Sequence, residues 1–208
     1  MFKIKDQKIG ILGLGYVGLP LFIEFAKFTE VVGFDTNKIR INELQNFNDI
    51  NLDISHLELQ QIGASKFSSN SEALSDCNVF IITVPTPIDV NARPNLKPLI
   101  AASKTVSKFL KTNDVVIYES TVYPGATEEV CIPELENISG LKFNKDFFVG
   151  YSPERINPGD KTKKLKDIEK IVSGSNVKTS EFVQQLYEKI IDAGTFMAKD
   201  IKTAEAAK

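Results

Sequence analysis

The 208-residue sequence has few of the features that mark secreted, membrane-spanning or nucleic-acid-binding proteins. Its two cysteines, Cys77 and Cys131, are too few for a disulfide framework and indicate reduced thiols. No apolar run reaches membrane-spanning length, and the N-terminal residues lack the apolar stretch of a signal peptide. The net charge is −2 without a basic block, so charge gives no reason to expect nucleic acid. We therefore expect a cytoplasmic protein with no membrane or nucleic-acid partner.

Histidine is equally scarce, because His56 is the only one. No serine, cysteine or carboxylate stands at a recognisable catalytic spacing from it, so we expect His56 to be structural or exposed. We also expect no metal site. With 42% hydrophobic and 25% charged residues, the composition is that of an ordinary globular protein long enough to bury a core.

A glycine-rich turn near the N-terminus is the most informative stretch of the chain. The apolar residues 9–12 predict a buried strand, and they lead into Gly13, Gly15 and Gly18 at the spacing G-x-G-x-x-G. We expect Gly13 to permit a tight turn and Gly15 to let the backbone approach a pyrophosphate. Gly18 would let the next helix pack closely against the sheet. The alternative is a purely structural turn.

The residues after the glycines strengthen this prediction. A helix is expected from near Tyr16 to about Lys27, and its first N–H groups would face the phosphates. A second strand over 31–34 ends at Asp35, where an acid accepts the ribose hydroxyls of NAD. The same acid would repel the additional phosphate of NADP. The stretch therefore predicts an NAD site.

The rest of the chain alternates between predicted strands and helices. Further strands are predicted at 66–67, 78–84, 114–121, 147–151, 168–172 and 195–198. Helices are predicted at 36–47, 71–74, 96–110, after 123, at 176–191 and from 200 onward. Residues 48–64 give a poor periodic signal. This order predicts an α/β, Rossmann-like, doubly wound and mostly parallel sheet with helices on both faces.

Polar residues follow several of the predicted strands. Pro85-Thr86-Pro87 follows the strand predicted at 78–84, and Ser120-Thr121 ends the strand predicted at 114–121. Because the carboxyl ends of parallel strands form the ligand crevice, Thr86 and Thr121 are candidate cofactor contacts. The loop 152–160 carries a carboxylate beside a guanidinium and could be either a site or a solvated turn.

Six strings of the sequence resemble motifs of the UDP-glucose/GDP-mannose dehydrogenase family. They are Gly13–Pro20, Gly33–Asp35, Val84–Pro87, Glu119–Thr127, Tyr151–Asp160 and Ala204–Lys208. The strings span nearly the whole chain in the family's order. Two stretches that overlap these strings, 123–129 and 152–160, look more like the branch that acts on UDP-N-acetylhexosamines than the UDP-glucose branch.

The resemblance implies an activity and a set of site residues. Such enzymes oxidise a sugar C6 alcohol to a carboxylate in two hydride transfers to NAD, and their products enter surface polysaccharides such as capsule or lipopolysaccharide. The implied cofactor contacts are Gly13, Gly15, Tyr16, Val17, Gly18, Asp35, Arg40, Pro85, Thr86, Ser120 and Thr121. Arg40, at the start of the helix expected over 36–47, could instead be solvated.

The resemblance also assigns roles near the end of the chain. Glu154 matches the carboxylate that helps to activate water against a thioester, and Lys208 matches the lysine that stabilises developing oxyanion charge. Both are expected to contact the UDP-sugar substrate. Arg155, Ile156 and Asn157 fall in the segment that lines the nucleotide-sugar site.

The sequence lacks several parts of the family pattern, among them the central helix, the dimer core and the C-terminal UDP-binding domain. The family's nucleophilic cysteine lies beyond the position of Lys208, in a glycine-rich motif that these residues lack. We expect residues 1–199 to form the NAD(P)-binding domain and residues 200–208 to begin the connecting helix of a larger enzyme, a homodimer or higher oligomer at full length. Two alternatives stay open: a stand-alone NAD-binding module without catalysis, and a different NAD dehydrogenase of the hydroxyacid type.

Overall fold

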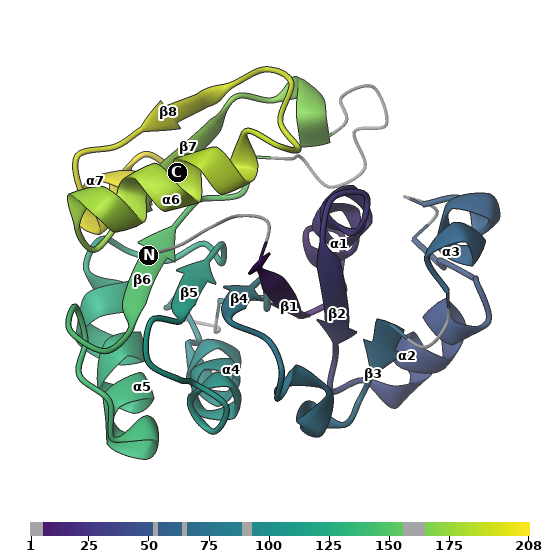
Figure 1. The fold of residues 1–208 in the computed structure, drawn as a ribbon, viewed down its shortest axis with the longest axis horizontal. Helices are drawn as coiled ribbons and strands as arrows, with labels where there is room; N and C mark the ends of the chain where they lie inside the picture. Colours follow the sequence, from purple (N-terminus) through teal and green to yellow (C-terminus); the bar gives the residue numbers. More distant parts are fainter. Residues whose placement is uncertain (1–5, 52–53, 64–65, 89–92, 156–164) are drawn as a thin grey trace.

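An eight-stranded sheet forms the centre of the molecule in the computed structural model, which describes residues 6–51, 54–63, 66–88, 93–155 and 165–208 (Figure 1). The strands are β1 (Lys8–Leu12), β2 (Glu30–Phe34), β3 (Phe67–Ser68), β4 (Val79–Ile82), β5 (Val115–Tyr118), β6 (Phe148–Tyr151), β7 (Lys170–Gly174) and β8 (Thr195–Met197). Their order is β3-β2-β1-β4-β5-β6-β7-β8. Neighbouring strands are parallel except for the antiparallel pair β6 and β7. The first six strands have the order of a doubly wound dinucleotide-binding sheet, which confirms the predicted fold class.

Helices connect these strands. They are α1 (Gly18–Ala26), α2 (Lys38–Gln45), α3 (His56–Ile62), α4 (Lys97–Ser107), α5 (Ile132–Ser139), α6 (Val177–Tyr187) and α7 (Ile201–Ala206). Short 3₁₀ helices span Ser71–Leu74 and Leu165–Asp167, and a π-helical turn spans Thr127–Cys131. α1 begins two residues later than the sequence predicts, and α6 ends at Tyr187 instead of 191. No described helix is long and apolar enough to cross a membrane.

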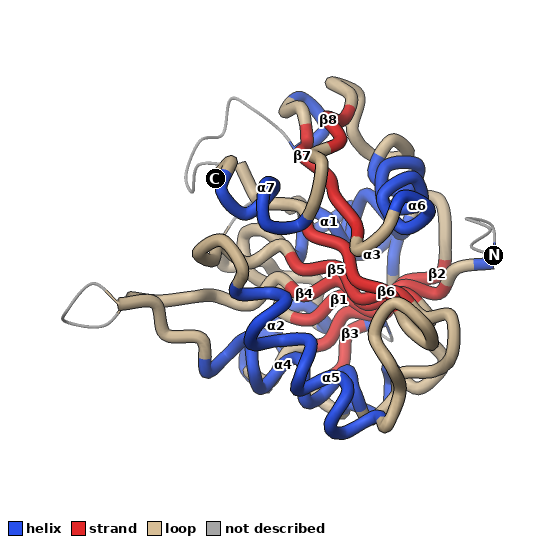
Figure 2. Tube along the Cα trace, turned by 90° about the vertical axis from the view of Figure 1, so that its left-hand side faces the viewer, coloured by secondary structure: helices blue, strands red, loops and turns tan. Residues whose placement is uncertain are grey.

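The sheet is buried on both faces, and the strand sequences explain why. In β4, Val79 and Ile81 join one apolar cluster, whereas Phe80 and Ile82 join the other. Successive side chains of a strand point to opposite faces of the sheet, and here the residues on both faces are apolar. Residues of α1 and α6 belong to the first cluster, and residues of α4 and α5 belong to the second. Figure 2 shows α6 and the pair α4 and α5 on opposite sides of the strands.

The antiparallel strand β7 brings its first residue to the edge of the sheet where the parallel strands end. Tyr151 of β6 lies opposite Ser173 of β7, so the start of β7 points back past the end of β6. Lys170 therefore lies at the edge where the parallel strands β5 and β6 end. α7 packs beside β6 and β7, and Ile201 and Ala204, which lie three residues apart on one face of the helix, are buried.

A buried carboxylate precedes β5 and makes the fold sensitive to pH. Asp114 is 4% exposed, and its Oδ2 accepts a hydrogen bond from the backbone N–H of Lys111 at 2.7 Å. Burial raises the pKa of Asp114 from 3.8 to about 7, although the Lys111 hydrogen bond opposes the shift. The native state therefore binds this proton more tightly than the unfolded state, so the free energy of unfolding falls as the pH rises from about 4 to about 7.

We predict that Asp114→Asn removes most of this pH-dependent loss of stability. The amide can still accept the Lys111 hydrogen bond but does not ionise, so no buried charge forms at pH 8. Each unit of pKa shift corresponds to about 1.4 kcal/mol, so the variant should gain on the order of a few kcal/mol relative to wild type between pH 5 and pH 8. Urea unfolding at both pH values measures this difference.

Asp146→Asn is the matched control, because Asp146 accepts a similar bond from the N–H of Lys142 at 2.8 Å but is more exposed. It should leave the pH dependence unchanged. Equal pH dependence in the Asp114 variant and wild type would contradict the assignment.

Candidate active site

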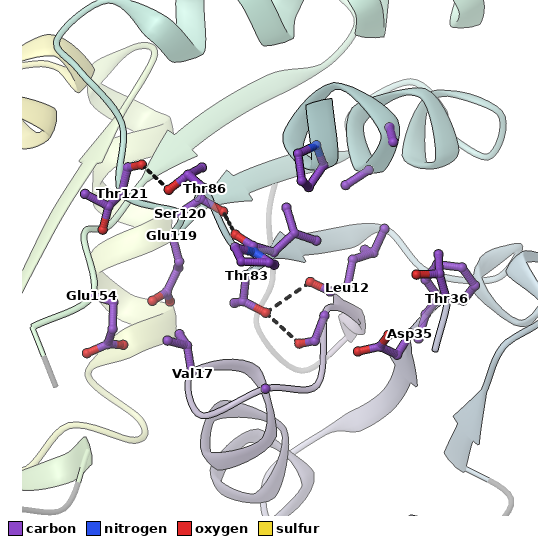
Figure 3. Close-up of a pocket in the computed structure, with 18 of the residues that line it drawn as sticks. Leu12, Val17, Asp35, Thr36, Thr83, Thr86, Glu119, Ser120, Thr121 and Glu154 are labelled. Atoms are coloured by element: carbon purple, nitrogen blue, oxygen red, sulfur yellow. Dashed lines mark hydrogen bonds between the residues drawn. The ribbon is translucent and has the colours of Figure 1, made fainter. Parts of the chain in front are cut away.

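A cavity of about 750 Å³ opens at the carboxyl edge of the sheet (Figure 3). It is lined by residues that follow β1, β2, β4 and β5, together with one side of α4 and Glu154 from the loop after β6. In Figure 3, Asp35 and Thr36 lie on one side of this cavity, and Glu119, Thr121 and Glu154 lie on the other. The cavity therefore lies where ligands bind in doubly wound sheets.

Each glycine of the turn has a different steric reason to be glycine. Gly13 has a φ of +94°, which a residue with a side chain rarely adopts. A Cβ on Gly15 would have no atom within 4 Å, so the backbone there faces open space in the cavity. A Cβ on Gly18 would lie 1.8 Å from the carbonyl oxygen of Gly13. Gly18 thus permits the packing of α1 and does not line the cavity, in contrast to Gly13 and Gly15.

The amino-terminal end of α1 points toward the same open space. Val17 occupies the N-cap position, and no side chain caps this end of the helix. Tyr16 and Val17 both line the cavity. Uncapped N–H groups and the positive end of a helix dipole suit an anion, so this end fits a pyrophosphate.

Asp35 joins the end of β2 to the glycine turn. Its Oδ2 accepts a hydrogen bond from the N–H of Leu14 at 2.8 Å, and its Oδ1 accepts one from the N–H of Asn37 at 2.8 Å. The carboxylate also lines the cavity, and each oxygen has a further lone pair for a hydroxyl. Asp35 can therefore hold a ribose and support the turn at the same time.

Arg40 is buried rather than solvated, so the solvated alternative is wrong. Its Nε donates to the carbonyl oxygen of Leu14 at 2.8 Å, and its Nη1 lies 2.8 Å from Oδ1 of Asp49. The side chain lines a separate pocket of about 320 Å³ beside Asp35 and Gly15, not the main cavity. Arg40 thus stabilises the glycine turn from the side of the smaller pocket. A direct contact of Arg40 with the cofactor remains a prediction.

The loops after β4 and β5 close the other side of the cavity. Thr86 Oγ1 donates to the carbonyl oxygen of Thr121 at 2.6 Å, and Ser120 Oγ donates to that of Val84 at 2.6 Å. Pro85, Thr86, Ser120 and Thr121 all line the cavity, as the predicted crevice requires. The two loops are therefore fixed to each other across the cavity wall.

A buried ionic cluster lies at the same end of the cavity. Lys170 Nζ lies 2.5 Å from Glu119 Oε2 and 3.2 Å from Glu154 Oε2. The hydroxyl of Tyr187 in α6 donates to Glu119 Oε1. Glu119 and Lys170 are site residues that sequence reasoning missed. The sequence signal for Lys170 is its charged side chain at the start of an otherwise apolar strand, Lys170-Ile-Val.

The charges in this cluster depend on one another. Burial raises the pKa of Glu119, and the ammonium of Lys170 opposes this shift. Burial alone would lower the pKa of Lys170, but the two glutamates more than compensate and its pKa is raised. Lys170 therefore stays charged because both carboxylates lie beside it.

α7 connects this cluster to a second loop of the site. Lys208 Nζ donates to the backbone carbonyl oxygen of Glu154, and burial lowers the pKa of Lys208. Glu205 accepts hydrogen bonds from the N–H groups of Gly125 at 2.5 Å and Thr127 at 2.9 Å. α7 and the residues that follow it thus hold the loops after both β5 and β6.

Of the remaining candidates at this end, the structure describes only Arg155. Arg155 Nη1 reaches the carbonyl oxygen of Glu169 at 3.5 Å. Ile156 and Asn157 lie outside the described residues. Their expected contact with a nucleotide sugar therefore stays a prediction.

Other reactive groups lie away from this chemistry. Burial raises the pKa of Cys77 and Cys131 to about 12, so neither thiol supplies a thiolate near neutral pH. His56 is exposed, and its Nδ1 lies 2.8 Å from the carbonyl oxygen of Phe47. Within the part of the chain that the structure describes, no group of histidine, cysteine and acidic residues could hold a metal ion.

Comparison with known proteins yields close relatives. UDP-N-acetyl-D-glucosamine 6-dehydrogenase of Salmonella typhi is 56% identical over 208 residues, which cover all of this chain and 49% of that protein. The enzyme of the same name from Pseudomonas aeruginosa is 56% identical over 205 residues, 99% of this chain and 49% of that protein. The chain therefore spans about half the length of the curated relatives it matches.

The structural comparison agrees with the sequence comparison. The structure of UDP-D-ManNAc dehydrogenase from Pyrococcus horikoshii matches with a TM-score of 0.84 and 33% identity, over 95% of this chain and 48% of that one. Residues 7–191 also match the sequence profile of the NAD-binding domain of a single family. The chain belongs to the UDP-glucose/GDP-mannose dehydrogenase family and contains its NAD-binding domain.

Proposed function

We propose that this chain is the NAD-binding part of a UDP-N-acetylhexosamine 6-dehydrogenase, which oxidises UDP-N-acetylglucosamine, UDP-N-acetylgalactosamine or a related UDP-sugar to the uronic acid. The identity of 56% with two UDP-N-acetyl-D-glucosamine 6-dehydrogenases carries the proposal. Its product would enter the synthesis of surface polysaccharide. The family profile over residues 7–191 favours this function over a dehydrogenase of the hydroxyacid type.

NAD would lie along the length of this cavity. Gly15 leaves open space beside the uncapped start of α1, where the pyrophosphate would lie. Asp35 would hold the adenosine ribose at one end, and Thr121 and Glu154 would flank the nicotinamide at the other. Bound NAD would supply the hydride acceptor for both oxidation steps.

Two residues of this chain would serve the substrate. The Lys208 ammonium would stabilise negative charge on the sugar oxygen, and the Glu154 carboxylate would accept a proton from the attacking water. The bond from Lys208 Nζ to the backbone of Glu154 supports this pairing, because it brings both groups to one end of the cavity. Arg155, Ile156 and Asn157 would line the sugar site.

We further propose that residues 1–199 form the cofactor domain and residues 200–208 begin a helix that leads into the rest of a longer, oligomeric enzyme. The relatives' greater length supports this division. The nucleophilic cysteine of the family would come from that second half. A stand-alone NAD-binding module is the competing function, and the turnover assay described below distinguishes the two.

We predict that the chain binds NAD more tightly than NADP because the Asp35 carboxylate repels the additional phosphate. Asp35→Ala should weaken NAD binding by about 1.5–3 kcal/mol, the scale of hydrogen bonds to charged groups. Part of that loss would come from the glycine turn, since Leu14 N–H loses its acceptor. Titration calorimetry with both cofactors measures these affinities.

Asp35→Asn separates the contribution of the carboxylate charge from that of the hydrogen-bond acceptor. It retains one acceptor oxygen but no charge, so NAD should bind better than it does to the alanine variant, and the preference over NADP should narrow. Equal affinity of the wild-type chain for NAD and NADP would contradict the role of Asp35 in selecting NAD.

The 208 residues alone should bind NAD and yet form no NADH from UDP-sugars. The two-step oxidation needs a thiolate to hold the aldehyde, and the two thiols here are buried with pKa values raised to about 12. Absorbance at 340 nm (NADH) with UDP-N-acetylglucosamine and UDP-N-acetylgalactosamine measures turnover. Activity should appear in a longer gene product that continues past Lys208.

Two outcomes would count against the proposal. Sustained turnover by these residues alone would show that no second cysteine-bearing half is required. A longer gene product that binds NAD but oxidises no UDP-sugar would favour a non-catalytic module.

A further inference from the structure

The buried cluster beside Glu154 contains two carboxylates and one ammonium. Glu119, Glu154 and Lys170 are at most 5% exposed, and the ammonium contacts both carboxylates at 2.5 Å and 3.2 Å. They come from the ends of β5, β6 and the antiparallel β7, so only the sheet topology brings them together. Two of the three, Glu119 and Glu154, also border the cavity.

The hydrogen bonds in the cluster fit two ionised carboxylates. Glu119 accepts from Lys170 at one oxygen and from the Tyr187 hydroxyl at the other. Glu154 accepts from Lys170 at Oε2 and from the N–H of Arg155 at Oε1, at 2.6 Å. These four partners are all donors, and hydrogen bonds donated to a carboxyl group favour its ionised form.

Other titratable groups face the cluster from the neighbouring elements. The Lys208 ammonium donates to the backbone of Glu154, and the Arg155 guanidinium lies nearby. Tyr187 of α6 and Tyr151 of β6 have pKa values raised mainly by burial, so both are neutral near pH 7. Among these groups, Glu119 and Lys170 have the charges buried most deeply, where solvent screens them least.

We propose that Lys170 and Glu119 are a pair of positioning residues that set the proton affinity of the Glu154 carboxylate by opposing charge. Lys170 favours the ionised form of Glu154, and Glu119 disfavours it. Their effects offset each other, so Glu154 would be kept ready to accept a proton and to release it. The importance of this balance for catalysis rests on the proposed function, but the balance itself does not.

The proposal predicts opposite effects for two substitutions. Lys170→Met leaves two buried carboxylates side by side, so the protonation midpoint of Glu154 should rise by roughly 1–3 pH units. Glu119→Gln removes the neighbouring negative charge and keeps the Lys170 ammonium beside Glu154, so the midpoint should fall. The double variant removes both charges and should bring the midpoint back toward that of wild type. A merely structural role would not produce shifts of opposite sign that cancel.

The midpoint can be measured in this chain without any enzymatic activity. Glutamate labelled with ¹³C at the side-chain carboxyl is titrated by NMR, and the Glu154 resonance is identified by its loss in Glu154→Gln. Lys166→Met is the matched control, because Lys166 is an exposed lysine whose Nζ pairs with Asp192 at 3.2 Å and not with Glu119 or Glu154. It should leave the Glu154 midpoint unchanged.

Each result of the NMR titration either supports or overturns the proposal. Opposite shifts that cancel in the double variant support the proposal, whereas shifts of the same sign, or none, overturn it. If Lys170→Met does not fold by circular dichroism, Glu119→Gln and the double variant still decide: the first must lower the midpoint and the second must lie above it.

A second readout uses the longer gene product. There the acid limb of the kcat profile should move in the same directions as the NMR midpoints, with KM changed less than kcat. NMR shifts without any change in the rate profile would leave the charge balance standing but show that Glu154 is not the proton acceptor. Absence of turnover in every variant and in wild type would count against the proposed function alone.

Discussion

The missing side chain at Gly18 is the constraint on which the site depends. The carbonyl oxygen of Gly13 occupies the space 1.8 Å from where a Cβ would stand, so α1 can begin directly beside the end of β1. That close start places the uncapped helix end against the open space at Gly15. The hydrogen bonds from Leu14 N–H to Asp35 and from Arg40 to Leu14 then hold the turn from both sides. A larger residue at position 18 would separate the helix from the strand and remove the anion site.

Local patterns in the sequence were sufficient for the sheet and for the glycine turn. Buried strands show as apolar runs, and the three glycines show at fixed spacing, because the steric reasons for both lie within a few residues. α3 lay in the stretch with a poor periodic signal, although its capping box of Ser55 and Glu58 is visible as S-x-x-E. The burial of Arg40 and the contact between Lys170 and Glu119 could not be predicted in this way. They depend on the order of the strands and on the reversed direction of β7, which brings together residues 51 positions apart.

The two ends of the cavity differ in how they hold charge. At the Asp35 end, a carboxylate is anchored by backbone N–H groups and still borders the cavity. At the Glu154 end, the carboxylates are buried and are balanced by Lys170 from the antiparallel strand. The C-terminal residues hold this second end, since Glu205 of α7 binds the loop after β5 and Lys208, just beyond α7, binds the loop after β6. The Glu154 end of the cavity is therefore the one that depends on the C-terminal strands and on the C-terminal residues 201–208.

A crystal structure of this chain with NAD tests the central claim most directly. The pyrophosphate should lie over the backbone of Gly15 at the start of α1, the adenosine ribose hydroxyls should contact the Asp35 carboxylate, and the nicotinamide should lie between Thr121 and Glu154. A cofactor whose pyrophosphate lies away from Gly15, or whose ribose occupies the smaller pocket beside Arg40 without contacting Asp35, would contradict this account.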